Sequence, residues 1–260
     1  MKLKDKVAIV TGGGSGIGRA IAKEFAGEGA KIVIADFNRG KAESVVEEIT
    51  KSGGTALAVK TDVGFAGDVE SMVRETLEKF GGINILVNNA GIILQSEVVN
   101  TKEEDWDRII RNNLKSCFLC SREVARQMIK QDKGGKIINI SSIHATLSEP
   151  SAGAYTAAKG GMEAFSRTLA TELAPYKINV NCIEPGATYT ELTIPMYTES
   201  VKKSLFERIP LKEIAQPEWI ARGAVFLASE DSRYMTGQVM VMDGGYVMDG
   251  SLPGAKYWEK

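Results

Sequence analysis

The sequence is poor in the residues that would point to metal or disulfide chemistry. It has one histidine, His144, and three cysteines among 260 residues. Cys117 and Cys120 form a Cys-x-x-Cys pattern inside a stretch with helical periodicity, and Cys182 lies in an apolar run. A structural zinc site takes four nitrogen or sulfur ligands. We therefore expect no metal site and interpret the three thiols as buried, free, intracellular cysteines.

Long hydrophobic runs and an excess of one charge are also missing. Lysine and arginine total 32 and aspartate and glutamate 33, which gives a formal net charge of -1 and no basic surface for nucleic acid. The apolar runs are shorter than the ~20 residues of a membrane-spanning helix. Residues 1–6 lack the apolar core of a signal peptide. These absences predict a cytoplasmic protein with a small-molecule partner and neither a membrane nor a nucleic-acid partner.

Short apolar runs alternate with helical patterns along the chain. The runs are continuously hydrophobic, as in parallel strands that are covered on both faces. Alternating strands and helices predict an α/β, Rossmann-type, doubly wound parallel sheet of about seven strands within a single domain, residues 1–260. The predicted strands are 7–10, 31–35, 56–60, 84–88, 136–141, 178–184 and 238–242. The predicted helices are 16–28, 40–52, 67–80, 102–132, 154–175 and 217–228.

Two stretches depart from this alternation. Residues 187–216 follow the sixth strand, where ligands of such sheets bind, and are interpreted as a substrate lid. The tail, 246–260, contains Tyr257 and Trp258, which we expect to pack on a neighbouring subunit. A third local signal, Thr101-x-x-Glu104, predicts a capping box at the start of the fourth helix.

A glycine-rich turn joins the first predicted strand to the first predicted helix. Glycine allows a tight turn and a close approach of backbone N–H groups to a diphosphate at the positive end of the helix. Its position inside a strand–helix–strand unit favours dinucleotide binding over an ordinary turn. The residues expected to contact the cofactor here are Gly12, Ser15, Gly16, Ile17 and Gly18.

The choice of cofactor depends on Asp36, which ends the second predicted strand. A carboxylate there can accept hydrogen bonds from the ribose hydroxyls of adenosine and repels the 2′-phosphate of NADP. Ser15 supplies no positive charge for that phosphate, whereas Arg39 could. The pattern favours NAD over NADP.

Tyr155 and Lys159 lie four residues apart near the start of a predicted helix and therefore share one face of it. An ammonium group favours the phenolate and is expected to lower the tyrosine pKa from its ordinary value of about 10. A Tyr-x-x-x-Lys pattern alone is also compatible with an ordinary amphipathic turn.

The spacing of the glycines and several later motifs resemble the short-chain dehydrogenase/reductase family. The resemblance implies that Asp62 and Val63 contact the adenine ring and that residues 88–91 stabilise the sheet and line the cofactor. It also implies that residues 185–190 hold the nicotinamide end and that residues 243–245 close the seventh strand. The further cofactor contacts implied are Asn89, Ala90, Gly91, Pro185, Gly186, Thr188 and Thr190, together with Tyr155 and Lys159.

The same resemblance assigns catalytic roles. Ser142, thirteen residues before Tyr155, is expected to hold the reacting oxygen, with Ser141 as the alternative. Asn113 matches the helix asparagine of the family and could hold a water against Lys159 through its side chain, with Asn112 as the shifted alternative. Tyr155 then exchanges a proton with an alcohol or carbonyl, while Lys159 holds the nicotinamide ribose and the nicotinamide exchanges the hydride.

Polar residues near the predicted site favour a sugar or polyol as the substrate, because unpaired hydroxyl groups are costly to bury. The expected substrate contacts are His144, Glu149 and Glu184. The segments 141–144, 159–162 and 185–187 also resemble bacterial glucose dehydrogenases of the family. Apolar residues of the lid would equally suit an acyl chain, as in 3-oxoacyl thioester reductases. A non-catalytic nucleotide-binding protein is an alternative from a different functional class.

The resemblance also implies a homotetramer that is built on the fourth and fifth long helices and the seventh strand. The helix predicted over 154–175 contains many small residues, which permit close packing against another helix.

Overall fold

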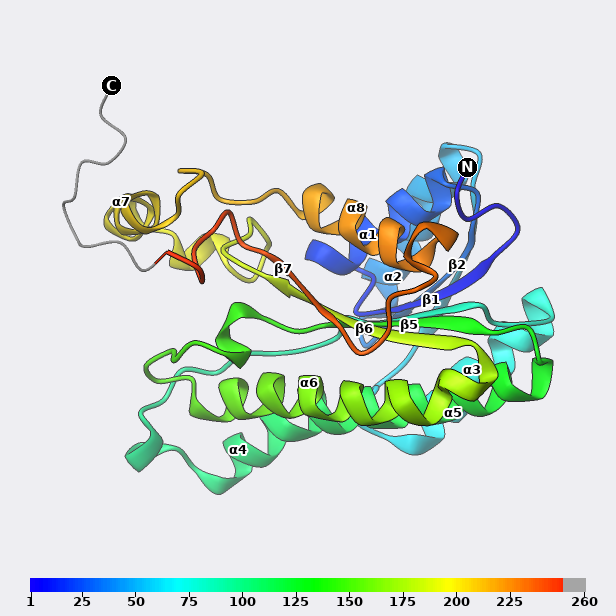
Figure 1. The fold of residues 1–260 in the computed structure, drawn as a ribbon, viewed down its shortest axis with the longest axis horizontal. Coiled ribbons are helices and arrows are strands. Elements are labelled where there is room, and N and C mark those ends of the chain that lie inside the picture. The colour runs from blue at the N-terminus through cyan, green and yellow to red at the C-terminus, as the bar shows by residue number, and fades with distance from the viewer. Residues whose placement is uncertain (250–260) are drawn as a thin grey trace.

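Apolar and largely β-branched segments form the central sheet of the computed structural model, which describes residues 1–249. Within those residues one sheet has the order β3-β2-β1-β4-β5-β6-β7, and every neighbouring pair is parallel (Figure 1). The predicted Rossmann-type sheet is confirmed. The strands are β1 (Val7–Thr11), β2 (Lys31–Asp36), β3 (Thr55–Lys60), β4 (Ile85–Asn88), β5 (Gly135–Ile140), β6 (Ile178–Pro185) and β7 (Val239–Met242).

Helices cover both faces of the sheet, so its side chains are buried in two separate apolar layers (Figure 1). One layer packs under α1 (Gly16–Gly27), α2 (Arg39–Lys51) and α8 (Pro217–Ala228). The other packs against α3 (Ala66–Phe80), α5 (Ser116–Gln131) and α6 (Gly153–Leu173). Short 3-10 segments join these elements: η1 (Val98–Asn100), η3 (Ile143–Ala145), η4 (Ala174–Tyr176) and η6 (Glu230–Ser232).

The helix predicted over 102–132 is interrupted. It comprises α4 (Glu103–Ile110), a π-helical turn, η2 (Arg111–Lys115), and α5. Such π-turns inside α-helices are frequent at functional sites, and this one contains Asn113. The capping-box prediction was wrong: Lys102 precedes α4, while the Thr101 hydroxyl donates to Glu97 O at 3.0 Å in the preceding turn.

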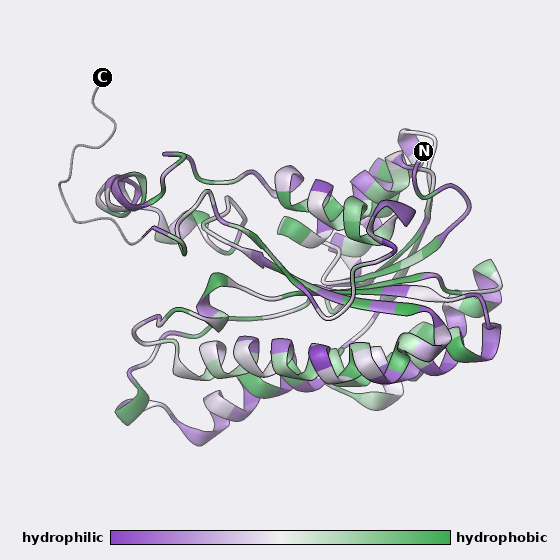
Figure 2. Cartoon of the chain, viewed as in Figure 1, coloured by the Kyte–Doolittle hydropathy of each residue, from purple (hydrophilic) through white to green (hydrophobic). Residues whose placement is uncertain are grey.

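The predicted lid, 187–216, contains regular structure of its own. A 3-10 turn, η5 (Ile194–Met196), precedes α7 (Glu199–Arg208), which begins at Thr198, whose hydroxyl accepts from Val201 N at 3.4 Å. Figure 2 shows α7 as a largely hydrophilic helix set apart from the two layers that cover the sheet. Ile209 and Ile214, at the end of the segment, are buried, so only the part around α7 lies outside the core.

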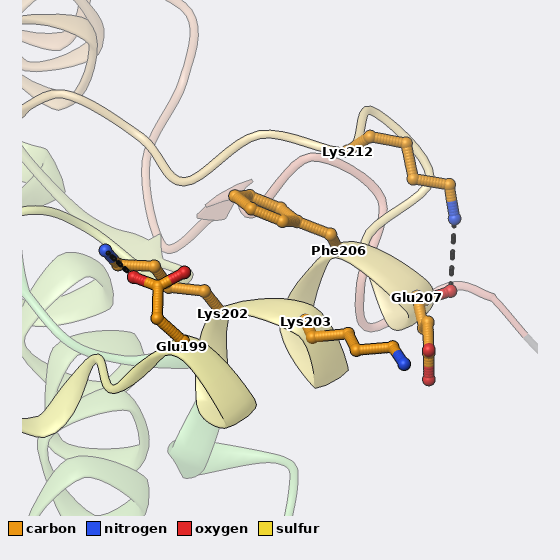
Figure 3. Close-up of a pocket in the computed structure, with 6 residues that line it drawn as sticks. All are labelled: Glu199, Lys202, Lys203, Phe206, Glu207 and Lys212. Atoms are coloured by element: carbon orange, nitrogen blue, oxygen red, sulfur yellow. Dashed lines mark hydrogen bonds and ion pairs between the residues drawn. The ribbon is translucent and has the colours of Figure 1, made fainter.

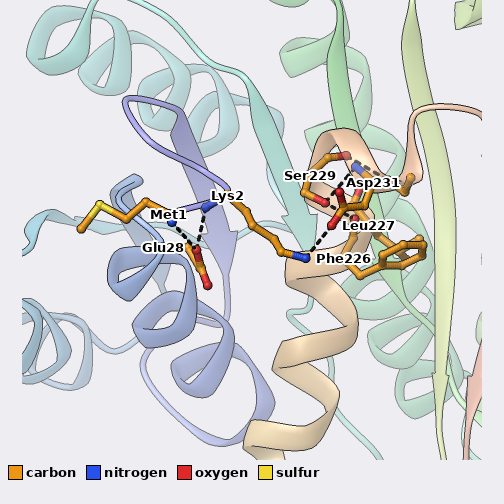
Figure 4. Close-up of polar contacts among 8 residues, drawn as sticks. Met1, Lys2, Glu28, Phe226, Leu227, Ser229 and Asp231 are labelled. Carbon is orange, nitrogen blue, oxygen red and sulfur yellow. Dashed lines mark hydrogen bonds and ion pairs between the residues drawn. The ribbon is translucent and has the colours of Figure 1, made fainter.

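The first residues are fastened to the helical layer (Figure 4). Leu3 is fully buried, and Lys2 N donates to Glu28 Oε2 at 2.6 Å. The side chain of Lys2 forms an ion pair with Asp231, which follows α8. These contacts fix the chain before it enters β1.

The three cysteines are buried and free in the described part of the chain, as the sequence predicts. Burial raises the pKa of the Cys117 and Cys182 thiols to about 12, so both are uncharged. Among residues 1–249, no helix is long and apolar enough to cross a bilayer. Tyr257 and Trp258, on which the tail hypothesis depends, lie outside the described residues.

Candidate active site

The glycine-rich turn brings the ends of β1 and β4 together. Gly12 and Gly16 have φ values of +60° and +52°, which favour glycine. A Cβ atom on Gly18 would lie 2.3 Å from Gly12 O and 2.4 Å from Asn89 Nδ2. Asn89 Nδ2 in turn donates to Thr11 O at 3.0 Å and to Gly12 O at 3.1 Å. The turn is therefore packed too closely for any larger residue at position 18.

The start of α1 suits a diphosphate. Ser15 lies at the N-cap position and, among the described residues, its side chain makes no capping hydrogen bond. The N–H groups of Gly16, Ile17 and Gly18 begin the helix and are left to bind an anion, which the helix dipole favours. Thr190 of the lid lies over the same turn, because a Cβ on Gly16 would be 3.3 Å from Thr190 Cβ.

The Asp36 carboxylate ends β2 beside the same turn. Its Oδ2 accepts from Gly14 N at 2.9 Å and its Oδ1 from Asn38 N at 2.8 Å. Arg39, the cation that could contact the 2′-phosphate of NADP, instead donates to Glu43 at 2.7 Å.

Sequence reasoning missed a second cation at this position, Lys41. Its Cβ would lie 2.9 Å from a Cβ on Gly14, and its Nζ is 2.6 Å from Glu191 Oε2 in the lid. The sequence could have indicated Lys41 as a cation near the cofactor, because it lies in the first turn of the helix that follows Asp36.

The residues expected to contact the adenine ring and to stabilise the sheet lie at the carboxyl ends of β3 and β4. Asp62 Oδ1 accepts from Gly64 N at 3.0 Å, and Val63 is buried among apolar side chains. Ala90 N donates to Thr11 Oγ1 at 3.1 Å, which places residues 89–91 beside the glycine turn. A Cβ on Gly91 would lie 2.4 Å from Asn113 Oδ1. These residues form one continuous edge at the carboxyl ends of β1, β3 and β4.

The predicted catalytic residues meet at the carboxyl end of β5. Ser142 follows this strand, Tyr155 and Lys159 lie one turn apart on α6, and the hydroxyl groups of Ser142 and Tyr155 are hydrogen-bonded. Lys159 Nζ is 5.5 Å from the centroid of the Tyr155 ring and donates to Ile140 O at 2.7 Å. Ser141 points away and donates to Glu163 Oε1 at 2.6 Å. The geometry supports Ser142 over Ser141.

Burial governs the ionisation of the pair on α6. It raises the pKa of Tyr155, and the hydrogen bond with Ser142 lowers it in part. It also lowers the pKa of Lys159 to about 8, against an opposing effect of Cys117, Cys182 and Glu163. The prediction that Lys159 lowers the tyrosine pKa was wrong for this arrangement, because its ammonium is directed at the Ile140 carbonyl.

Asn113 is fully buried in the π-helical turn, and its side chain binds backbone groups of Ile92 and Ile109. Its Nδ2 donates to Ile92 O and Ile109 O, both at 2.9 Å, and its Oδ1 accepts from Ile92 N at 3.1 Å. Both amide hydrogens are therefore used, so only Oδ1 is left to hold the water that is expected beside Lys159. Asn112 faces outward and donates to Arg108 O at 2.7 Å.

The three expected substrate residues lie in two different environments. His144 Nε2 lies 3.6 Å from Glu149 Oε2, and burial lowers the histidine pKa while Glu149 opposes the shift. Glu184 is only 1% exposed and its carboxyl group contacts that of Glu163. This burial does not fit the expected role of Glu184 as a substrate contact.

The residues expected at the nicotinamide end connect β6 to the lid. Pro185 ends β6, and Gly186 N donates to Met242 O at 3.0 Å. Thr188 Oγ1 donates to Gly186 O at 2.9 Å, and Thr188 N donates to Tyr197 Oη at 3.1 Å. The first residues of the lid are thus held in a fixed turn.

A separate pocket of about 410 Å³ lies on α7 and the turn that follows it (Figure 3). Lys202 pairs with Glu199 at 3.0 Å, and Lys212 Nζ donates to Glu207 O at 3.1 Å. Its lining contains none of the predicted catalytic or cofactor residues: Glu199, Lys202, Lys203, Phe206, Glu207 and Lys212.

Comparison with known proteins agrees with this geometry. A family model described as enoyl-(acyl carrier protein) reductase matches residues 12–247. The 3-oxoacyl-[acyl-carrier-protein] reductase of Synechocystis is 40% identical over 248 residues, 95% of this chain and 98% of the relative. A crystal structure of a short-chain type dehydrogenase/reductase from Mycobacterium marinum is 33% identical, with a TM-score of 0.91, over 94% of this chain and 96% of that one.

One further similar structure is 7α-hydroxysteroid dehydrogenase in complex with NADH and 7-oxo glycochenodeoxycholic acid. It is 33% identical, with a TM-score of 0.91, and the match covers 94% of this chain and 95% of that one. The chain belongs to the short-chain dehydrogenase/reductase family. It is an oxidoreductase that acts on CH–OH or carbonyl groups and binds a nicotinamide cofactor.

Proposed function

We propose that the protein reduces the 3-oxo group of an acyl thioester and uses NADH. The observation that carries the substrate class is the apolar character of the lid immediately after Thr190. Leu192, Ile194 and Met196 are 54%, 57% and 38% exposed there. Exposed apolar side chains next to a site favour contact with an apolar ligand. The 3-oxoacyl-[acyl-carrier-protein] reductase from Synechocystis adds support.

The ionisation of the site suits reduction. The raised pKa keeps Tyr155 protonated at neutral pH, and a protonated phenol can donate to a carbonyl oxygen as it gains charge. Ser142 holds that oxygen and stabilises the developing charge. Lys159, with a pKa of about 8, remains mostly an ammonium that can hold the nicotinamide ribose. When bound, the nicotinamide supplies the hydride.

The preference for NADH rests on Asp36. Its carboxylate stands at the end of β2, where adenosine ribose hydroxyls bind in this fold. A 2′-phosphate would meet its negative charge, and the nearby cations Arg39 and Lys41 are paired with Glu43 and Glu191. Titration of the protein with NADH and NADPH should show tighter NADH binding, and Asp36→Asn should reduce the difference. Tighter binding of NADPH to the wild-type protein would overturn the assignment.

A second candidate substrate is a sugar or polyol. His144 and Glu149 lie 3.6 Å apart just after Ser142 and could bind hydroxyl groups. The burial of Glu184 removes the third polar residue from this hypothesis.

A substrate panel tests the proposal. The purified protein is incubated with NADH and 3-oxoacyl thioesters of several lengths, and with NAD⁺ and aldoses, polyols and secondary alcohols. We expect turnover of the thioesters that Tyr155→Phe abolishes and that Tyr234→Phe, a change at a fully exposed tyrosine, leaves intact. Turnover confined to sugars or polyols would replace the substrate class. Cofactor binding without any turnover would favour a non-catalytic protein.

A further inference from the structure

A buried pair of carboxyl groups lies directly behind the catalytic residues. Glu163 is on α6, one turn after Lys159, and Glu184 is on β6. Their side chains are within hydrogen-bonding reach of each other and are 6% and 1% exposed. Glu163 and Glu184, 21 positions apart in the chain, thus meet where α6 packs on β6.

The contacts of the pair favour a state in which the two carboxyl groups hold one proton between them. Ser141 Oγ donates to Glu163 Oε1 at 2.6 Å. Two ionised carboxylates in contact in a buried place repel each other strongly. Glu184 Oε1 is buried and has no hydrogen-bond partner among the described residues. A lone acceptor is less costly on a neutral carboxylic acid than on a carboxylate.

The surroundings of the pair agree with this assignment. Burial and the neighbouring carboxylates of Glu163 and Asp243 raise the pKa of Glu184 to about 8. The other ionisable groups that face the cluster are Lys159 on α6, Cys182 on β6 and Cys117 on α5. Lys159 is the one cation among them, and the carboxylate of Glu163 favours its charged form.

We propose that Glu163 and Glu184 are positioning residues that share one proton and keep a single negative charge behind Lys159 and Ser142. Through Ser141, Glu163 holds the end of β5, which supplies the Ile140 carbonyl to Lys159 and leads into Ser142. Glu184 supplies the proton that lets a second carboxyl group fit there. The inference deepens the proposed function and rests on it for the link to turnover.

Infrared titration of the protein alone tests the shared proton without any substrate. We expect the wild-type protein to show one buried carboxylic acid at neutral pH that deprotonates near pH 8. Glu184→Gln should lack this signal, and Glu172→Gln, at an exposed glutamate of α6, should retain it. Absence of the signal in the wild-type protein, or its persistence in Glu184→Gln, would refute the pair.

The pH dependence of turnover tests the positioning role. Glu184→Gln mimics the protonated acid, so its kcat/KM at pH 7 should stay within about twofold of wild type. Its loss of activity at alkaline pH should remain, because it is set by the Lys159 ammonium. Glu163→Gln removes the charge that supports the Lys159 ammonium. In the pH profile of this variant, the loss of kcat/KM at alkaline pH should begin about one pH unit lower than in the wild-type protein. Its kcat/KM at neutral pH should fall roughly tenfold.

Conservative replacement separates charge from packing. Glu163→Asp keeps the negative charge and should recover most of the alkaline limb that Glu163→Gln loses. If kcat/KM of Glu163→Gln depended on pH in the same way as that of the wild-type protein, the positioning role of Glu163 would be overturned. Because the infrared signal needs no substrate, failure of the thioester panel would remove the proposed function and leave this test of the pair intact.

Discussion

At the scale of the residue, two adjacent serines at the end of β5 have different tasks. Ser142 is hydrogen-bonded to Tyr155, whereas Ser141 donates to Glu163 at 2.6 Å on the opposite side of the backbone. Successive side chains at the end of a strand point to opposite faces of the sheet. One serine therefore faces the reacting oxygen and its neighbour faces the buried carboxyl groups.

Alanine substitution should separate these tasks. Ser142→Ala removes the donor that stabilises charge on the reacting oxygen, so kcat should fall by about 10²–10³. Ser141→Ala removes only the link through which Glu163 holds the end of β5, so its loss of kcat should stay within about tenfold. It should also lower the melting temperature, because it leaves a buried carboxyl group short of a donor. Steady-state kinetics and thermal unfolding of both variants measure the difference. A larger loss of kcat in Ser141→Ala would reverse the assignment.

The stability of the protein should depend on pH through Glu184. Its pKa is raised from 4.5 to about 8 in the folded protein. Between these values the folded state binds a proton that the unfolded state has released, so the free energy of unfolding falls as pH rises through this window. Glu184→Gln carries no such proton. Denaturant titrations should show the variant gaining stability relative to wild type from about pH 5 to pH 8; a constant difference would contradict the shift.

At the scale of the element, the lid is joined to the cofactor region by two contacts. Thr190 lies against Gly16 in the glycine-rich turn, and Glu191 pairs with Lys41 of α2 at 2.6 Å. Because α7 is largely hydrophilic and lies apart from the core layers, this part of the lid can move while Ile209 and Ile214 stay buried (Figure 2). We infer that these contacts hold the lid over the cofactor.

Glu191→Gln should weaken this closure. An exposed ion pair contributes only about 0–1 kcal/mol to stability, so the melting temperature should hardly change. The Kd for NADH should instead rise by about two- to fivefold. Glu43→Gln breaks the Arg39–Glu43 pair of α2 without touching the lid and is the matched control. Equal effects of both substitutions on NADH binding would argue against a latch.

At the scale of the whole molecule, apolar side chains remain exposed on the helices that the family resemblance assigns to subunit contacts. Phe118 on α5 is 41% exposed, its ring lies 6.2 Å from that of Phe165 on α6, and Arg122 stacks on it at 5.2 Å. Trp106 on α4 is exposed as well. We propose that this surface pairs with a second copy of the chain in a homotetramer.

Phe118→Glu should break that assembly, because it places a charge where apolar surface would be buried. Light scattering coupled to gel filtration should show a smaller particle than the wild-type protein. Phe37→Glu, at an exposed phenylalanine after β2, should leave the mass unchanged. A wild-type protein that is already monomeric would contradict the proposed tetramer.

The sequence by itself determined the order of the strands and helices, the glycine-rich turn, and the grouping of Ser142, Tyr155 and Lys159. The first two features depend on patterns within short stretches of the chain, whereas the role of Ser142 beside Tyr155 and Lys159 was implied by the family resemblance. Apolar runs define parallel strands, strand ends meet at one edge of the sheet, and residues four apart share a helix face. The prediction of a lid over residues 187–216 rests on the place of this segment after β6.

Only the tertiary structure decided where Glu184 and Asn113 point and what Lys41 contacts. Glu184 is buried against Glu163, Asn113 bonds Ile92 from a π-helical turn, and Lys41 meets Glu191 across 150 positions of the chain. No local pattern encodes these partners. A side chain's ionisation and hydrogen bonds depend on which distant surfaces exclude water from it, and that exclusion exists only once the helices have packed on the sheet.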